Sequence, residues 1–254
     1  MNRRFSIVLC MAAALLAASP VRAADIRLLS AAAMQSVFKE IIGDFERASG
    51  HKVIITYATI GGVNQRMLDG EAADVVIGST LSMPALVKEG KIEPASQVAI
   101  CKTGIGGVVP LGDTKPPFAS VEDFKQALLA AKVLIYADPV RGGAAGVHIA
   151  KVLQQLGIAE RLKSQITLGA GGDVTEVTIA QGDGALGLTQ ISEIIGKTTA
   201  QYVGPVPAEL QNYTIFVVGV PPAARRSPAV WEFIAFLVSP PAVAAIKAKG
   251  MQVD

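Results

Sequence analysis

Three turns built almost entirely from small residues carry the chemistry that this sequence can offer. They occupy residues 28–34 (LLSAAAM), 57–63 (YATIGGV) and 138–146 (DPVRGGAAG), and each follows an apolar run and precedes a helical pattern. Small side chains let a ligand approach the backbone closely. The free N–H groups and the positive dipole end of a following helix favour an anion there. The three turns together predict a site for a small anionic molecule.

Two charged side chains lie in the third turn, and a third follows a later pair of glycines. Arg141 stands one residue before the double glycine of the third turn, and a guanidinium gives a planar, bidentate fit to a carboxylate. A solvent-facing loop arginine is the alternative interpretation. Asp138 is expected to fix its own turn with the proline that follows it. Asp173, after two glycines, has the position of a helix cap.

Motifs for catalysis or for metal binding are absent from the sequence. His51 and His148 are the only histidines, and with Cys101 they form no recognisable metal set. The sequence contains no Ser-His-Asp signature, no phosphate-loop lysine motif and no dinucleotide glycine fingerprint. We therefore expect no metal, no cofactor and no dedicated catalytic residue.

The first 23 residues are typical of a signal peptide. Arg3 and Arg4 precede an apolar segment at 5–17, and small residues allow cleavage near Ala23. A retained membrane anchor is the alternative, but the apolar segment is short for a membrane span. We expect a periplasmic protein without membrane insertion after cleavage. Cys101 then remains alone, so no intrachain disulfide is expected.

Composition indicates a globular protein and excludes a nucleic-acid partner. Hydrophobic residues make up 51% of the chain and charged residues 17%, which is typical of a folded domain. The formal charge of +2 includes three arginines and no acidic residue from the first 23 positions, so the mature chain carries −1. This balance favours neither nucleic acid nor an anionic membrane surface.

The hydrophobic pattern of the mature chain predicts an α/β fold. Short apolar runs, expected to be strands, alternate with amphipathic segments whose apolar residues recur every three or four positions. This order predicts parallel sheets covered by helices on both faces. The expected strands are 26–29, 53–57, 74–77, 133–136, 166–168, 185–188 and 214–220. The expected helices are 34–45, 61–68, 120–131, 144–156, 174–180, 229–237 and a last one after Ser239.

Two extended segments, 98–110 and 202–220, suggest two lobes. They are rich in glycine and proline and have no helical period, so we interpret them as paired connections between lobes. Ordinary strands at a sheet edge are the alternative. The predicted division is a signal peptide at 1–23, a discontinuous lobe 1 at 24–100 plus 213–254, and lobe 2 at 101–212.

Several of these segments carry a family resemblance that covers essentially the whole mature chain. The matching stretches are 30–34 (SAAAM), 57–62 (YATIGG), 69–77 (DGEAADVVI), 137–146, 182–187 (GDGALG) and 248–251 (AKGM). In them the chain resembles the exported molybdate-binding proteins of bacterial ABC transporters. The resemblance implies the type II periplasmic binding protein fold, in which each lobe is a mostly parallel sheet flanked by helices and the ligand lies between the lobes.

The same resemblance implies a set of ligand-binding positions. Two serine hydroxyls that hold the oxyanion in the family match Ala33 and Ile60, neither of which can donate a side-chain hydrogen bond. A tyrosine of the family matches Gln190, and a backbone amide matches Ala145. The chain thus resembles a divergent member with the molybdate serines replaced. The predicted ligand-binding set is Ser30, Ala33, Thr59, Ile60, Gly61, Arg141, Gly143, Ala145, Thr189 and Gln190.

We therefore expect a monomeric solute-binding protein of an ABC importer. Its two lobes would close over one anion, held by backbone amides, hydroxyls and Arg141, and the closed form would dock on a membrane permease. Arg141 favours an organic carboxylate, and a molybdate-like oxyanion is the alternative.

An enzyme on the same scaffold is a second hypothesis. The altered first turn also suits the exported aconitate isomerases, which resemble this superfamily and move a double bond by proton transfer. Such a reaction needs a base, for which Asp173, His148 and Asp138 are candidates with no ground to choose among them. A purely structural role is a third option, but it leaves the three turns without explanation.

Overall fold

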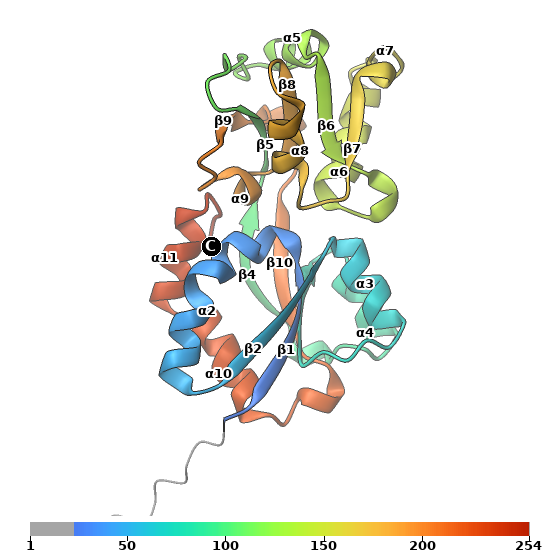
Figure 1. The fold of residues 1–254 in the computed structure, drawn as a ribbon. Helices are drawn as coiled ribbons and strands as arrows, with labels where there is room; N and C mark the ends of the chain where they lie inside the picture. Colours follow the sequence, from blue (N-terminus) through green and yellow to red (C-terminus); the bar gives the residue numbers. More distant parts are fainter. Residues whose placement is uncertain (1–22, 254) are drawn as a thin grey trace, which may run out of the picture.

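The computed structural model describes residues 23–253, which form two lobes with one five-stranded sheet each (Figure 1). Residues 1–22, which include nearly all of the predicted signal peptide, lie outside the described residues. The two-lobed α/β architecture expected from the sequence is confirmed.

Lobe 1 is built on a sheet with the strand order β2-β1-β3-β10-β4. Its strands are β1 (Asp25–Ala31), β2 (Lys52–Ala58), β3 (Val75–Ser79), β4 (Val98–Thr103) and β10 (Thr214–Gly219). Its helices are α2 (Gln35–Ser49), α3 (Ile60–Leu68), α4 (Met83–Lys88), α10 (Pro228–Leu237) and α11 (Pro240–Ala248). Short 3-10 turns are η1 (Ala32–Met34), η2 (Pro94–Ser96) and η6 (Pro222–Ala224).

The helices of lobe 1 cover both faces of this sheet because each has one apolar side. Val37, Phe38, Ile41 and Phe45 of α2 are buried, at the spacing that places them on one helical face. They pack with α10 and α11 on one side of the sheet, and α3 and α4 cover the other side (Figure 1). Helix α2 ends at Gly50, whose φ of 75° is the left-handed conformation that glycine adopts without strain.

Lobe 2 repeats this arrangement with the strand order β7-β6-β8-β5-β9. Its strands are β5 (Ile105–Pro110), β6 (Val133–Ala137), β7 (Ile166–Gly169), β8 (Ala185–Gln190) and β9 (Ala200–Pro205). Its helices are α5 (Val121–Ala130), α6 (Ala144–Gln155), α7 (Ala159–Leu162), α8 (Val174–Gln181) and α9 (Ile191–Ile194). Its 3-10 turns are η3 (Pro139–Arg141), η4 (Lys163–Gln165) and η5 (Ala208–Leu210).

Each sheet is mixed rather than mostly parallel. The strands joined by helices, β1 to β3 and β6 to β8, pair in parallel, as expected from the alternating pattern. Strands β10, β4, β5 and β9 join antiparallel. They belong to the segments that lead the chain from one lobe to the other, and antiparallel pairing needs no helical crossover.

The two connections between the lobes lie side by side and are tied together by one side chain. The chain passes from β4 to β5 at Gly104 and returns between β9 and β10. The Gln211 side chain in the return segment accepts from the Ile105 N–H (2.7 Å) and donates to the Ile105 carbonyl (2.9 Å). The two crossing segments therefore behave as one linked pair.

Within residues 23–253, no single helix is both long and apolar enough to cross a membrane. Only α10 and α11 counted together, with a 52° bend between them, reach that length and composition. Phe233 and Ile246 of these helices are buried in the core of lobe 1.

Candidate functional site

The three small-residue turns meet where the two lobes face each other, and they line part of a cavity of about 30 Å³, here called the cleft cavity. Each turn follows the carboxyl end of a parallel strand, β1, β2 or β6. In open α/β sheets this edge is where ligands bind. The lining residues are Ala31, Ala32, Ala33, Thr59, Ile60, Ala137, Gly143, Ala144, Ala145, Gly171, Gly172, Thr189, Gln190, Glu193 and Phe216.

Backbone amides at two helix starts are the principal hydrogen-bond donors at this cavity. Helix α3 begins at Ile60 and helix α6 at Ala144, and both residues line the cavity. The first N–H groups of a helix have no carbonyl partner within the helix, and they form the positive end of its dipole. In α3 the Gly61 N–H donates to the Gly142 carbonyl and the Gly62 N–H donates to the Thr59 hydroxyl, so the Ile60 N–H is the donor left for a ligand. One helix comes from each lobe, so an anion in the cavity would be held from both sides.

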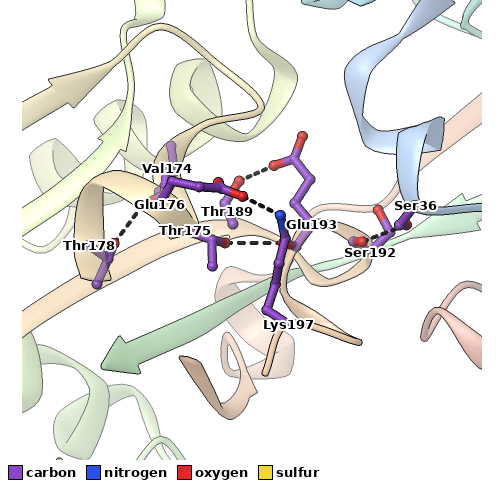
Figure 2. A network of polar contacts seen from close by, with 9 residues as sticks. All are labelled: Ser36, Val174, Thr175, Glu176, Thr178, Thr189, Ser192, Glu193 and Lys197. Carbon is purple, nitrogen blue, oxygen red and sulfur yellow. Dashed lines mark hydrogen bonds and ion pairs between the residues drawn. The ribbon is translucent and has the colours of Figure 1, made fainter. Parts of the chain in front are cut away.

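The lobes touch each other around the cavity through short polar contacts. The Gly61 N–H of lobe 1 donates to the Gly142 carbonyl of lobe 2 at 3.1 Å. The Thr59 hydroxyl donates to the Arg141 carbonyl at 2.6 Å. The Ser36 hydroxyl of α2 donates to the Ser192 carbonyl of α9 at 2.9 Å (Figure 2). A Cβ at Gly61 would lie 2.8 Å from the Cα of Gly142, so this contact requires glycine.

Most of the predicted ligand-binding set reaches the cleft cavity. Ser30 does not, because it is fully buried and its hydroxyl donates to the neighbouring carbonyl of Ala31 at 3.1 Å. Gly61 and Arg141 line an adjoining hollow of about 570 Å³, here called the outer hollow, and Arg141 is exposed. The residues that do line the cavity are Ala33, Thr59, Ile60, Gly143, Ala145, Thr189 and Gln190.

The three candidate bases lie outside the lining of the cleft cavity. Asp173 occupies the position before α8, but its carboxylate makes no cap bond; it accepts from two backbone N–H groups of the preceding loop at 3.1 and 2.8 Å. His148 Nε2 lies 2.7 Å from the carbonyl of Leu210. Asp138 accepts from the N–H of Val140 at 3.0 Å, which holds its own turn. All three side chains are engaged in local structure.

Glu193 is the acidic side chain that does line the cavity, and sequence reasoning missed it. It is the third residue of α9, and its carboxylate accepts from the N–H of Gln190, the residue that caps this helix. A glutamate three residues after the cap is a capping-box arrangement, and this spacing was the available signal. The Thr189 hydroxyl also donates to the carboxylate, and the two groups face each other in Figure 2.

The environment of Glu193 makes its carboxyl group titrate near neutral pH. Burial raises the pKa of Glu193 to about 7, and the negative charges of Glu176 and Asp173 add to the rise. The hydrogen bonds from Thr189 and from the Gln190 N–H act in the opposite direction. A carboxyl group with this pKa exists in both protonation states at neutral pH, as an acid-base catalyst or a proton-sensitive binding group requires.

The remaining reactive groups are placed away from the site. Cys101 is a free, buried cysteine whose pKa is raised to about 12 by burial, which makes it unreactive. Within residues 23–253, no three His, Cys, Asp or Glu side chains are grouped so that they could hold a metal ion.

Comparisons with known proteins agree with this architecture. The chain is 29% identical over 254 residues to a molybdate-binding protein of Azotobacter vinelandii, covering 96% of each chain. It is 26% identical over 256 residues to an aconitate isomerase of a Pseudomonas species, covering 96% of this chain and 95% of that protein. The solved periplasmic molybdate-binding protein of Azotobacter vinelandii superposes with a TM-score of 0.76 at 19% identity, covering 90% of this chain and 99% of that one.

At 19% identity, the solved molybdate-binding protein shows that the two chains share a fold, and it supports no conclusion about the ligand. A family model is more specific. The model for bacterial extracellular solute-binding proteins matches residues 26–252, which include both lobes and every wall of the cleft cavity. The chain belongs to the family of bacterial extracellular solute-binding proteins.

Proposed function

We propose that this protein is the periplasmic solute-binding component of an ABC importer and holds a small anion in the cleft cavity. The observation that carries the proposal is the meeting of two helix starts, at Ile60 and Ala144, on one cavity between two lobes. Two-lobed proteins of this kind act by closing over a ligand, which requires no chemical step. The closed monomer then docks on a membrane permease.

The donor inventory favours a small organic carboxylate over a tetrahedral metal oxyanion. Ala33 and Ile60 have no side-chain donor, and the Thr59 hydroxyl already donates to the Arg141 carbonyl. The Thr189 hydroxyl donates to Glu193. The donors that remain are the Ile60 N–H at the start of α3 and the first N–H groups of α6, because the Gly61 and Gly62 N–H groups already have acceptors. A carboxylate has two oxygens to satisfy and a tetrahedral oxyanion has four, so the carboxylate leaves fewer oxygens unpaired in a desolvated site.

Arg141 is assigned a secondary role at the mouth of the cleft. Its side chain is exposed and borders the outer hollow together with Arg66, which pairs with Glu71 at 3.0 Å. It therefore contacts a ligand that extends out of the cleft cavity and not one that fits inside it. Arg141→Ala is expected to leave the affinity for acetate unchanged and to weaken the binding of a longer dicarboxylate.

A panel of anions tests the ligand class. Purified mature protein is titrated by calorimetry with acetate, glycolate, succinate, sulfate, molybdate and tungstate, and thermal stability is measured with each. Stabilisation by the carboxylates supports the proposal, because a ligand that binds only the folded state raises its stability. If only the metal oxyanions bind, the carboxylate assignment is refuted.

The role of the amides is tested by removing one of them without removing its helix. Ala144→Pro deletes the N–H at the first position of α6, where proline is tolerated because that N–H has no helical partner. The preceding Gly143 is already extended, at φ −69° and ψ 123°, as a residue before proline requires. A lost charge-assisted hydrogen bond of about 1.5–3 kcal/mol predicts an affinity about 10- to 100-fold weaker. Val121→Pro, at the start of the remote helix α5, is the matched control.

A second candidate function, an isomerase resembling the aconitate isomerase relative, is favoured by Glu193. Its carboxyl group lines the cleft cavity and titrates near neutral pH, which suits a group that removes a proton from one carbon and returns it to another. Incubation with trans-aconitate, followed by proton NMR, tests this function. Formation of the cis isomer by the wild type and not by Glu193→Gln supports the isomerase function. If the wild type forms no cis isomer after prolonged incubation, this function is refuted.

A further inference from the structure

The cleft cavity presents hydrogen-bond acceptors as well as donors. Glu193 and Gln190 both line it. The Gln190 side chain donates from Nε2 to the Thr214 hydroxyl at 3.1 Å. Its Oε1 has no hydrogen-bond partner within residues 23–253. The Gln190 residue is only 5% exposed, so this oxygen is also shielded from bulk solvent. A buried carbonyl oxygen without a partner costs about 1–3 kcal/mol, so a donor from a ligand would be favourable here.

The carboxylate of Glu193 accepts from the Thr189 hydroxyl and from the Gln190 N–H, which leaves lone pairs for further donors. Its Oε1 lies near Gly172, at 3.9 Å from the position that a Cβ on this glycine would take. Within the described part of the chain, Glu193 forms no ion pair with a lysine or an arginine. Its acceptor capacity is therefore directed at whatever occupies the cavity.

The charged groups around Glu193 do not neutralise it. On the side of α8, Asp173 and Glu176 raise its pKa, and Lys197 is paired with Glu176 (Figure 2). A groove of about 290 Å³ adjoins the cleft cavity and shares Glu193 with it, and Lys39 and Lys249 line this groove. Lys249 is paired with Glu40 of α2 at 2.8 Å, and Lys39 is exposed to solvent.

An anion without a proton to donate therefore meets repulsion on one wall of the cavity. Its negative oxygens are attracted to the helix starts, but any oxygen facing Glu193 or Gln190 opposes another lone pair. A ligand that carries a hydroxyl or a retained acidic proton reverses that contact, because its O–H donates to the acceptor. Sites built to hydrogen-bond a ligand hydroxyl discriminate strongly against analogues that lack it.

We propose that the cleft cavity selects anions that carry their own hydrogen-bond donor beside the anionic group, and that Glu193 and Gln190 receive that donor. The class comprises short hydroxycarboxylates and singly protonated tetrahedral anions, and it excludes fully deprotonated sulfate and molybdate. The inference rests on the proposed function, since it specifies the ligand of the same cavity. It assigns Glu193 as the specificity-determining residue.

Two matched pairs of anions provide the test. Calorimetric titration at pH 8 compares glycolate with acetate, and phosphate with sulfate, because the members of each pair differ chiefly in the O–H group. The first member of each pair is expected to bind at least about 10-fold more tightly, which corresponds to one well-formed hydrogen bond to a charged group. Equal affinities within both pairs would overturn the inference while leaving anion binding intact.

Glu193→Gln is the decisive variant, because it keeps the shape of the side chain and removes the charge. The preference within each pair should fall to about 3-fold or less, mainly because acetate and sulfate bind more tightly once the repulsion is gone. Glu160→Gln, in the exposed helix α7 with a side chain 90% accessible, should keep the wild-type preference. An unchanged preference in Glu193→Gln refutes the assignment. If none of the four anions binds to either protein, the proposed function itself fails and the inference falls with it.

Discussion

Replacing Glu193 by glutamine should stabilise the protein in the absence of ligand, and more so at high pH. The pKa of this carboxyl group rises from 4.5 to about 7 on folding, chiefly because burial disfavours the charged form. The folded state thus binds the proton more tightly than the unfolded state, and stability falls as pH rises from about 4.5 to about 7. Below that range the carboxyl is neutral in both states and the cost disappears.

The size of the effect follows from the two pKa values. A group with these values destabilises the folded state by about 3 kcal/mol at pH 8 and about 1 kcal/mol at pH 5, a difference of about 2 kcal/mol. Because the Glu193 side chain is only partly shielded from solvent, a difference of about 1–2 kcal/mol is expected. Urea denaturation of wild type and Glu193→Gln at pH 5 and pH 8 measures it, with Glu160→Gln as the control. A stability difference that is the same at both pH values would refute the reasoning.

Three further predictions concern positions that depend on backbone space or on burial. Gly61→Ala should weaken anion binding at least about 10-fold, because its Cβ would lie 2.8 Å from the facing glycine Cα; unchanged affinity in calorimetry contradicts this. Gly146→Ala should cost about 1–3 kcal/mol in urea denaturation, because its Cβ would lie 2.0 Å from the Ala137 carbonyl oxygen. Gly43→Ala, inside α2, should instead stabilise the folded protein by about 0.5–1 kcal/mol. Equal changes in stability for Gly146→Ala and Gly43→Ala would refute this reasoning. Cys101, with a pKa of about 12, should resist an aromatic disulfide reagent at pH 8 until denaturant is added, and rapid reaction of the native protein would be inconsistent with its burial.

Much of the fold was predictable because local patterns and tertiary structure agree in this chain. The Ser120 hydroxyl accepts from the Asp123 N–H at the start of α5, a capping arrangement next to the start of the expected helix 120–131. Gly50 ends α2 in the left-handed conformation that glycine adopts without strain. The mixed character of the sheets was not predicted, because the direction of β4 and β10 depends on how the chain crosses between lobes. No local pattern in an isolated strand encodes that direction.

The site was predictable as a backbone surface but not as a set of side chains. Small residues mark the turns, and the family resemblance pointed to Ala33, Ile60 and Ala145, which line the cleft cavity. The direction of a side chain depends on packing across the cleft, which the sequence does not display. Arg141 therefore turned out to border the outer hollow. Glu193 was missed because a glutamate at a helix start usually serves only as a cap.

The central position of β10 in the sheet of lobe 1 has a consequence for the order in which the protein folds as it is synthesised. Strand β4 pairs only with β10 in that sheet, and β10 lies between β3 and β4. The sheet of lobe 2 is complete once residue 205 has emerged, whereas lobe 1 must wait for residues 214–219 and for the helices that follow them. The lobe whose synthesis begins first is therefore the last that can finish folding, and until then β3 exposes an unpaired edge.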